Sequence, residues 1–112
     1  MPIIKVWCLP QESEEQLRLV HKSIVSAVVA VSELGLKDQN DMTVLFPTDM
    51  MKYGLGEEII IEVSLFEKPE RTDEVLNRLA VNVGMSLKRI YSKAKVECVV
   101  TTFNPRRGFW TM

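Results

Sequence analysis

Apolar and polar residues follow two different periods along this chain, and together these periods predict a strand, a helix and a second strand in its first half. Ile3–Leu9 is a short apolar run rich in β-branched residues and predicts a strand. Ser13 and Gln16 have the spacing of a helix capping box, and apolar residues then recur at three- and four-residue steps. The predicted helix continues to Gly35, which suits a left-handed stop. Met42–Phe46 is the second predicted strand.

The second half of the chain repeats this order of elements. Glu58–Phe66 is the third predicted strand, and a helix follows from Thr72 with one apolar face that continues to Ile90. Val96–Phe103 closes the pattern as the fourth strand. Each half therefore predicts one βαβ unit.

The two halves also share local sequence. Leu9–Glu15 aligns with Lys68–Glu74 at a constant offset of 59 residues (72 − 13). A duplicated βαβ unit is the economical explanation of this match. We expect one domain over residues 1–112, with the repeats at about 2–56 and 57–112.

Two βαβ units predict an α/β (α+β) fold, a four-stranded sheet with both helices on one face. This follows because each crossover is right-handed and each helix has one apolar stripe. Ile59–Ile61 and Val96–Val100 place apolar residues on both faces of the sheet. The face without helices would lie partly in water in a lone domain, so we expect the chain to form an oligomer.

Composition excludes several classes of function. The chain has 112 residues, 46% of them hydrophobic, and a net charge of −1, which argues against nucleic-acid binding although Lys88–Arg89 and Arg106–Arg107 could form a local basic patch. No apolar run approaches a membrane span and the start lacks the pattern of a signal peptide, so we expect a cytoplasmic protein. Cys8, Cys98 and the lone His21 provide neither a disulfide framework nor a metal site.

Pro2 is the first candidate for chemistry, because removal of Met1 would leave a proline with a free secondary amine. That nitrogen can accept a proton and is held rigidly by the strand that follows it. An internal proline nitrogen, in contrast, is an amide without basicity. Pro2 is therefore a candidate catalytic base, and the alternative interpretation is that it merely follows the start codon.

The C-terminal segment concentrates two cations and two aromatic rings on a short irregular stretch. Pro105 ends strand pairing and Gly108 permits a turn, so Arg106, Arg107 and Trp110 lie in a non-regular segment. This composition suits a pocket for an anionic, conjugated or aromatic molecule. It equally suits a contact between subunits, where Trp and Arg are common anchors.

Three features of the chain resemble the tautomerase superfamily. Pro2–Ile4 followed by Ser13–Gln16 resembles the strand-to-helix opening of the 4-oxalocrotonate tautomerases. Thr48–Gly56 is similar to the stretch after the second strand in that group, where an aromatic residue precedes a Gly-x-Gly turn. A fused pair of βαβ units of this length resembles macrophage migration inhibitory factor and the 5-carboxymethyl-2-hydroxymuconate isomerases.

The resemblance implies a homotrimer in which three four-stranded sheets form a barrel-like core wrapped by six helices, with sites at the subunit boundaries. It also implies cofactor-independent proton transfer, in which Pro2 acts as general base on a small carbonyl or enol compound. Burial against apolar walls and nearby cations would lower the pKa of the proline amine. Arginines would in addition bind a substrate carboxylate in bidentate fashion.

The remaining site residues are assigned by position, and here the chain departs from the family pattern. In the 4-oxalocrotonate tautomerases one arginine directly precedes the cap of the first helix and another lies within the second strand. The matching positions of this chain are Glu12 and Val44. Arg71 restores one of them in the second half, directly before the second helix, where the helix dipole gives a cation no benefit. Lys37 lies near a functional lysine position of migration inhibitory factor, and Tyr53 matches the aromatic residue that lines the family's pocket.

Two rival interpretations remain open. Strand-helix-strand twice over is also the order of a ferredoxin-like ligand-binding or regulatory module, in which Pro2 would have no catalytic role. A protein with the tautomerase fold could also act only through contacts with other proteins. Parallel pairing within each βαβ unit, a threefold assembly and Pro2 in a pocket would favour the tautomerase interpretation over the ferredoxin-like one.

Overall fold

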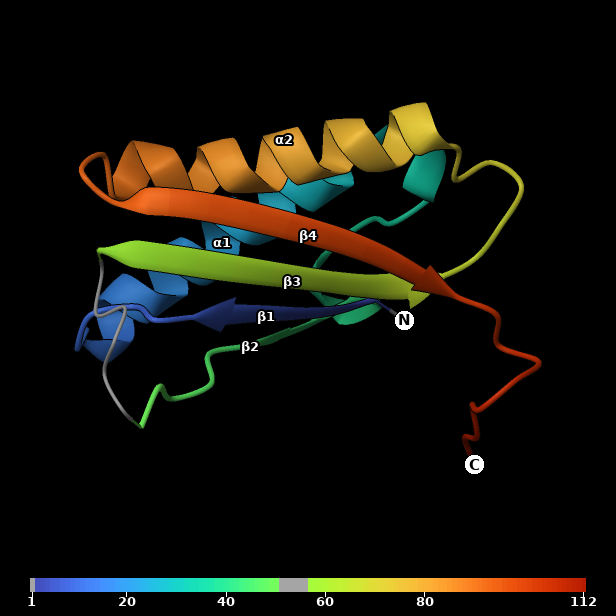
Figure 1. Ribbon diagram of the computed structural model, residues 1–112, viewed down its shortest axis with the longest axis horizontal. Coiled ribbons are helices and arrows are strands. Elements are labelled where there is room, and N and C mark those ends of the chain that lie inside the picture. The colour runs from blue at the N-terminus through green and yellow to red at the C-terminus, as the bar shows by residue number, and fades with distance from the viewer. Residues whose placement is uncertain (1, 51–56) are drawn as a thin grey trace.

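In the computed structural model, which describes residues 2–50 and 57–112, one four-stranded sheet carries two helices on one of its faces (Figure 1). The predicted α+β architecture is therefore confirmed. The elements follow in the order β1 (Ile3–Trp7), α1 (Glu14–Val29), η1 (Ser32–Leu34), η2 (Gln39–Asp41), β2 (Thr43–Leu45), β3 (Glu58–Phe66), α2 (Asp73–Ile90) and β4 (Lys95–Phe103), where η marks a 3₁₀ turn.

Side-chain caps fix where both helices begin. Ser13 Oγ accepts a hydrogen bond from the backbone N–H of Gln16 (3.1 Å), and Thr72 Oγ1 accepts one from that of Val75 (3.3 Å). Acidic residues fill the first turn of each helix, where the helix dipole favours negative charge. The two predicted helix starts are thus confirmed, and each helix starts by the same local mechanism.

The strands lie in the order β2-β1-β3-β4, with parallel pairing inside each βαβ unit and antiparallel pairing between the units. Ile3 of β1 pairs with Thr43 of β2 on one side and with Ser64 of β3 on the other, and Ser64 pairs in turn with Thr101 of β4. A ferredoxin-like sheet is built from split βαβ units, whose two strands are not neighbours. The observed pairing therefore supports the interpretation of two intact βαβ units.

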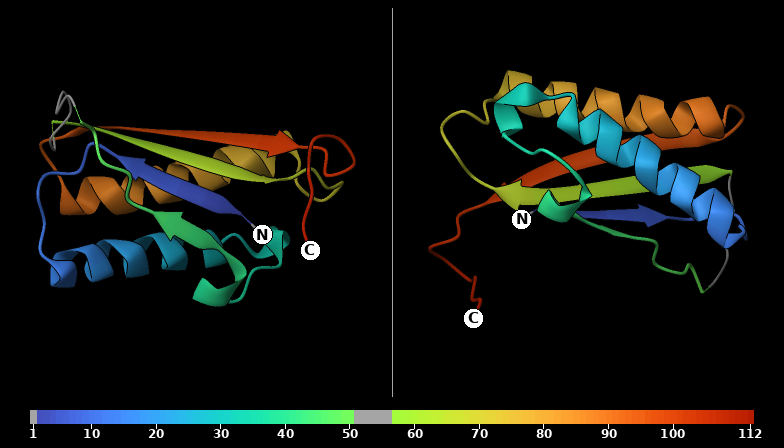
Figure 2. Two further views of the ribbon diagram at one scale, coloured as in Figure 1. Left: turned by 90° about the horizontal axis from the view of Figure 1, so that it is seen from below. Right: turned by 180° about the vertical axis from the view of Figure 1, so that it is seen from behind.

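The hydrophobic core lies between the sheet and the two helices. Alternate residues of β1 and β3 point to the helical face and are buried, as are the inward stripes of both helices. Figure 2 shows both helices on the same side of the sheet, as the right-handed crossovers predict. The largest fully buried side chains are Ile4, Ile24, Ile59, Ile61, Leu65, Leu79 and Leu87, together with Val6, Val20, Val28, Val31 and Val63.

Two predicted boundaries are wrong by two residues or more, and the local backbone conformation accounts for both. The predicted bounds of β2 and β4 differ from the observed ones by one residue. The first strand ends at Trp7 rather than Leu9, because Cys8 adopts a positive φ of 70° that leaves the extended region. The first helix ends at Val29, and the short 3₁₀ turn Ser32–Leu34 follows before Gly35 takes the left-handed conformation (φ 70°). Gly35 is thus a left-handed stop as predicted, but it ends the 3₁₀ turn.

The sheet leaves one face without helices, and this face is partly apolar. Ile3, Leu45 and Val99 are between 41% and 51% exposed on it, beside charged residues of the same strands such as Lys5 and Glu62. β2 and β4 are the edge strands, and β4 is nine residues long. Within residues 2–50 and 57–112, no helix is long and apolar enough to cross a membrane, and no cluster of three metal-ligating side chains occurs.

Candidate functional site

Pro2 lies at the start of the interior strand β1, where backbone pairing holds it from both sides. Its side chain is buried, and its carbonyl oxygen accepts a hydrogen bond from the backbone N–H of Thr43 (2.9 Å). The next residue, Ile3, pairs with Ser64 of the antiparallel strand β3. Pro2 therefore lies at the end of the sheet where β3 finishes, in a position fixed by strands from both βαβ units.

Arg71 occupies the same end of the sheet, in the connection from β3 to α2. Its side chain is only 9% exposed. Nη1 donates to the carbonyl oxygen of Phe66 (2.7 Å) at the end of β3, and Nη2 donates to that of Leu34 (3.4 Å) beyond α1. The guanidinium thus bridges the two βαβ units close to the point where β1 begins.

Arg71 is a buried cation without a carboxylate partner among the described residues. Burial lowers the pKa of its guanidinium below the ordinary value, and the nearby Glu70 carboxylate opposes this effect. Nε is buried and has no hydrogen-bond partner among the described residues, and no ion pair to Arg71 forms within them. A buried cation held by carbonyl dipoles raises the local positive potential, which favours an anion nearby.

The C-terminal segment extends from β4 beyond this same end of the sheet, and Figure 1 shows both chain termini there. Phe109 packs against Phe66 and Phe103 with ring centroids 5.1 and 6.0 Å apart, respectively. A turn at Asn104 precedes it, in which the Asn104 side chain accepts a hydrogen bond from the backbone N–H of Arg106 (2.9 Å). The aromatic cluster therefore anchors the tail to the ends of β3 and β4.

The two tail arginines and Trp110 remain accessible in the single chain. Arg106 and Arg107 are exposed, and Trp110 is 77% exposed. The other basic pair, Lys88–Arg89, lies in the last turn of α2, before β4 begins. Because the nine residues of β4 separate the two pairs by about 30 Å, they do not form one basic patch.

Lys37 and Tyr53 complete the set of predicted site residues. Lys37 is exposed between the two 3₁₀ turns, and its backbone N–H donates to Asp41 Oδ2 (2.7 Å). This carboxylate orders the backbone of the segment, and the Lys37 ammonium forms no ion pair among the described residues. Tyr53 lies outside the residues that the structure describes.

Sequence reasoning did not single out Phe66 and Phe103, which line the same end of the sheet. Their rings form an edge-to-face pair with centroids 5.1 Å apart. A signal was present in the sequence, because each is the last residue of a predicted strand and parallel neighbours end at the same edge. The Leu34 carbonyl carries no such signal, since its role depends on a contact 37 residues away in sequence.

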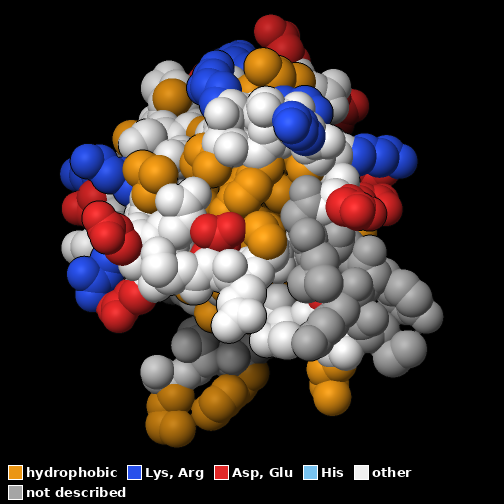
Figure 3. All heavy atoms as spheres, turned by 90° about the vertical axis from the view of Figure 1, so that its left-hand side faces the viewer, with side chains coloured by type: hydrophobic (Ala, Val, Ile, Leu, Met, Phe, Trp, Pro, Cys, Tyr) orange, Lys and Arg blue, Asp and Glu red, His pale blue; other side chains and the backbone are white. Residues whose placement is uncertain are grey.

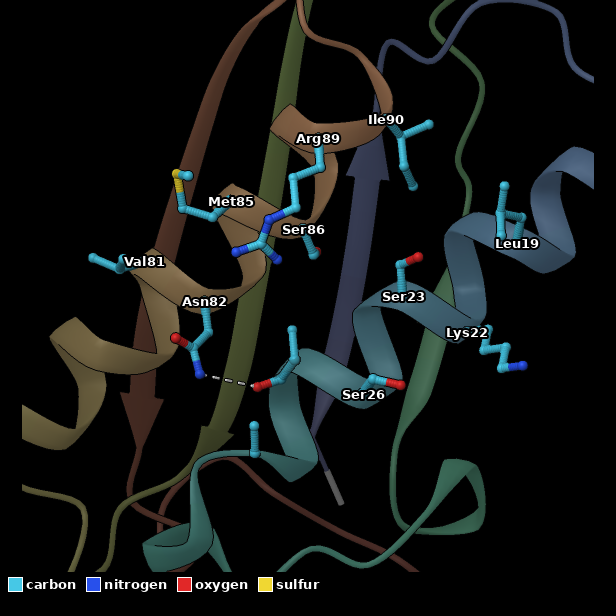
Figure 4. Close-up of a pocket in the computed structure, with 12 residues that line it drawn as sticks. Leu19, Lys22, Ser23, Ser26, Val81, Asn82, Met85, Ser86, Arg89 and Ile90 are labelled. Carbon is cyan, nitrogen blue, oxygen red and sulfur yellow. Dashed lines mark hydrogen bonds between the residues drawn. The ribbon is translucent and has the colours of Figure 1, made fainter.

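Further hollows lie away from Pro2. A groove of about 670 Å³ runs along the outer side of the helical layer between α1 and α2 (Figure 4). A smaller hollow of about 320 Å³, lined in part by Leu9, Pro10 and Phe46, lies near the opposite end of the sheet. Figure 3 views the molecule from that end and shows apolar side chains with acidic and basic ones around them.

Comparison with known proteins identifies the fold. No protein-family model and no curated protein sequence matches the chain. Among solved structures, it is similar to the F6 fused 4-OT asymmetric trimer, with 13% identity and a TM-score of 0.73 over 98% of this chain and 91% of that one. It is also similar to FG41 malonate semialdehyde decarboxylase inhibited by 3-bromopropiolate, with 22% identity and a TM-score of 0.69 over 98% and 89% of the two chains. The predicted tautomerase fold is therefore confirmed.

Replacing Arg71 by alanine is expected to destabilise the protein, because the buried Leu34 carbonyl oxygen and the partly buried Phe66 carbonyl oxygen lose their donor. The expected loss in the free energy of unfolding is about 2–4 kcal/mol, measured by urea denaturation at one protein concentration. The matched control is Arg107→Ala, which removes an exposed arginine at the same end of the molecule and should change stability by less than about 0.5 kcal/mol. Equal effects of the two substitutions would contradict a buried structural role for Arg71.

Proposed function

We propose that the mature chain, beginning at Pro2, is a cofactor-independent tautomerase or isomerase that acts on a small, carboxylate-bearing carbonyl compound. The observation that carries this proposal is the placement of Pro2. It is buried at the start of an interior strand, at the same end of the sheet as a buried guanidinium. The solved structures of similar fold include fused 4-OT and malonate semialdehyde decarboxylase, which supports the proposal at the level of the fold.

The proposed chemistry is the transfer of one proton. The proline nitrogen would take a proton from a carbon or enol oxygen next to a carbonyl group and become an ammonium ion. This ammonium ion would then return the proton to the substrate one or more bonds away. An ordinary secondary amine is mostly protonated at neutral pH and would be a poor base. Burial and the positive potential of Arg71 both disfavour the ammonium form, so each would lower the pKa of the amine.

The proposed substrate-binding groups are the cations and aromatic residues at this end of the sheet. Arg106 and Arg107 are exposed and free to bind a carboxylate in bidentate fashion. Arg71 already donates to two carbonyl oxygens, so its proposed contribution is mainly positive potential with Nε as the remaining donor. Tyr53, Lys37 and Trp110 are proposed to complete the pocket, the first two by their positions relative to the tautomerase pattern.

We also propose that the chain assembles as a homotrimer. The helix-free face exposes Ile3, Leu45 and Val99, and the long edge strand β4 offers unpaired backbone groups to a neighbouring strand. Fused 4-OT structures of similar fold are described as trimers, both symmetric and asymmetric. In such an assembly the exposed tail would lie at a subunit boundary and contribute to a shared site.

The catalytic role of Pro2 is tested by comparing the processed wild type with Pro2→Ala, using ketonisation of phenylenolpyruvate followed by ultraviolet absorbance. The alanine variant keeps a primary amine at its N-terminus, so kcat/KM should fall substantially without reaching zero. General-base contributions set the scale of this loss at about 10² to 10⁴. Intact mass must first establish that Met1 is absent from both proteins. Unchanged activity in Pro2→Ala would overturn the proposed base.

Substrate recognition is tested by Arg106→Ala and Arg107→Ala. We expect either change to raise KM about tenfold for a carboxylate enol and to leave KM for an uncharged analogue nearly unchanged, because only the carboxylate forms charge-assisted hydrogen bonds. Lys93→Ala, which removes an exposed lysine between α2 and β4, is the control and should change neither value. Similar effects on charged and neutral substrates would instead place the tail arginines in a subunit contact.

The proposed assembly predicts a solution mass of three chains by light scattering at micromolar concentration. Val99→Lys places a charge on the helix-free face and should shift the mass toward one chain. Leu19→Lys is the matched control, because Leu19 is 50% exposed on the helical layer while Val99 is 51% exposed on the sheet. A wild-type mass of one chain would contradict both the trimer and a site shared between subunits.

A further inference from the structure

The groove between α1 and α2 is built from two helix stripes that face each other on the side of the helices turned away from the sheet. Figure 4 shows Ser23 and Ser26 of α1 opposite Asn82 and Ser86 of α2, with the Asn82 side chain donating to the carbonyl oxygen of Ala27 (3.4 Å). Small side chains therefore form the floor, and they leave a trough of about 670 Å³ between the helices.

The shoulders of this trough are apolar and exposed. Leu19 on α1 and Val81 and Met85 on α2 are between 46% and 62% exposed. Figure 4 shows Val81 and Met85 on the shoulder of α2 that points away from α1. Exposed apolar side chains grouped along a groove, rather than scattered singly, are typical of a surface that contacts another molecule.

The charged residues of the groove are all positive. Lys22 on α1 and Arg89 on α2 line it, and no carboxylate does. Neither cation forms an ion pair with any residue among 2–50 and 57–112. Elsewhere on the same helices arginines are neutralised, as Arg78 is by Glu33 (2.8 Å) and Arg18 by Glu14 (2.6 Å). The groove thus combines apolar shoulders and a floor of small polar side chains with two cations that form no ion pair among the described residues. Figure 4 shows the Lys22 side chain pointing away from α2, so this lysine flanks the groove on the outer side of α1.

We propose that this groove binds an amphipathic helix of another protein, whose apolar face lies in the trough and whose carboxylates pair with Lys22 and Arg89. In helix-in-groove recognition an amphipathic helix lays its apolar face into a groove through anchors at i, i+3, i+4 and i+7. The small side chains on the floor of this groove leave room for such anchors between the two helices. Carboxylates that flank those anchors complement the two unbalanced cations. The partner's chemistry is therefore acidic and amphipathic.

The charge pattern also argues against a second copy of this chain as the occupant. A twofold contact through this groove would bring like charges together, because the same patch meets itself across the symmetry axis. Lys22 and Arg89 would then face lysines and arginines without a carboxylate from either groove. The groove is in addition on the helical layer, opposite the face through which the trimer is proposed to form. This inference therefore goes beyond the proposed function and does not depend on it.

Binding is tested with a fluorescein-labelled helical peptide of about 18 residues, with leucine at i, i+3, i+4 and i+7 and glutamate on both flanks. Fluorescence anisotropy should report saturable binding to the full-length wild type in the micromolar range. The same peptide with lysine in place of every glutamate should bind about tenfold more weakly or not at all. Circular dichroism of every protein variant used establishes that it is folded.

Three variants locate the peptide. Lys22→Glu combined with Arg89→Glu should weaken binding about tenfold or more, and Ser26→Trp should weaken it by filling the trough without a change of charge. Lys93→Glu is the matched control, because it reverses an exposed lysine close to the end of α2 that does not line the groove, and it should bind within about twofold of the wild type. The proposal is overturned if the wild type does not bind the acidic peptide, if both peptides bind equally, or if the groove variants bind like the control.

Discussion

The antiparallel ladder between β1 and β3 is the interaction on which the rest of the molecule depends. Five residue pairs, from Ile3 with Ser64 to Trp7 with Ile60, join two βαβ units that otherwise contain only parallel pairing. This ladder makes β1 an interior strand and buries the helical faces of both units in one core. It also brings the first residues of β1 to the point where β3 ends, which is why Pro2 and the end of the second unit share one edge of the sheet.

Arg71 adds a second link between the units, at the position where a functional cation was expected. Its guanidinium donates to one carbonyl oxygen from each unit, at Leu34 and at Phe66. A buried guanidinium costs desolvation free energy that two carbonyl acceptors offset only in part, since no carboxylate pairs with it among the described residues. Without a carboxylate partner the guanidinium keeps its positive potential, which is what the role proposed for Arg71 beside Pro2 requires.

Local patterns in the sequence were sufficient to predict the helices and strands and their order. The features that these patterns did not predict depend on backbone conformation and on tertiary contacts. The caps at Ser13 and Thr72 are read directly from residue type and spacing, and both form the expected bonds. The predicted length of the first strand was too great, because residue type does not signal the positive φ of Cys8 that ends the strand at Trp7. The burial of Arg71 could likewise not be predicted from the sequence, because its two carbonyl acceptors come together only when one βαβ unit packs against the other.

The shared edge has a practical consequence for handling the protein. Both termini lie at the end of the sheet that carries Pro2 (Figure 1), so an affinity tag on either terminus would sit beside the proposed site. An N-terminal tag would also keep the proline nitrogen in an amide bond, so the proposed basic amine could not form. Ser92 and Lys93, exposed in the connection from α2 to β4, lie at the other end of β4 and offer an internal position for a label or an inserted epitope.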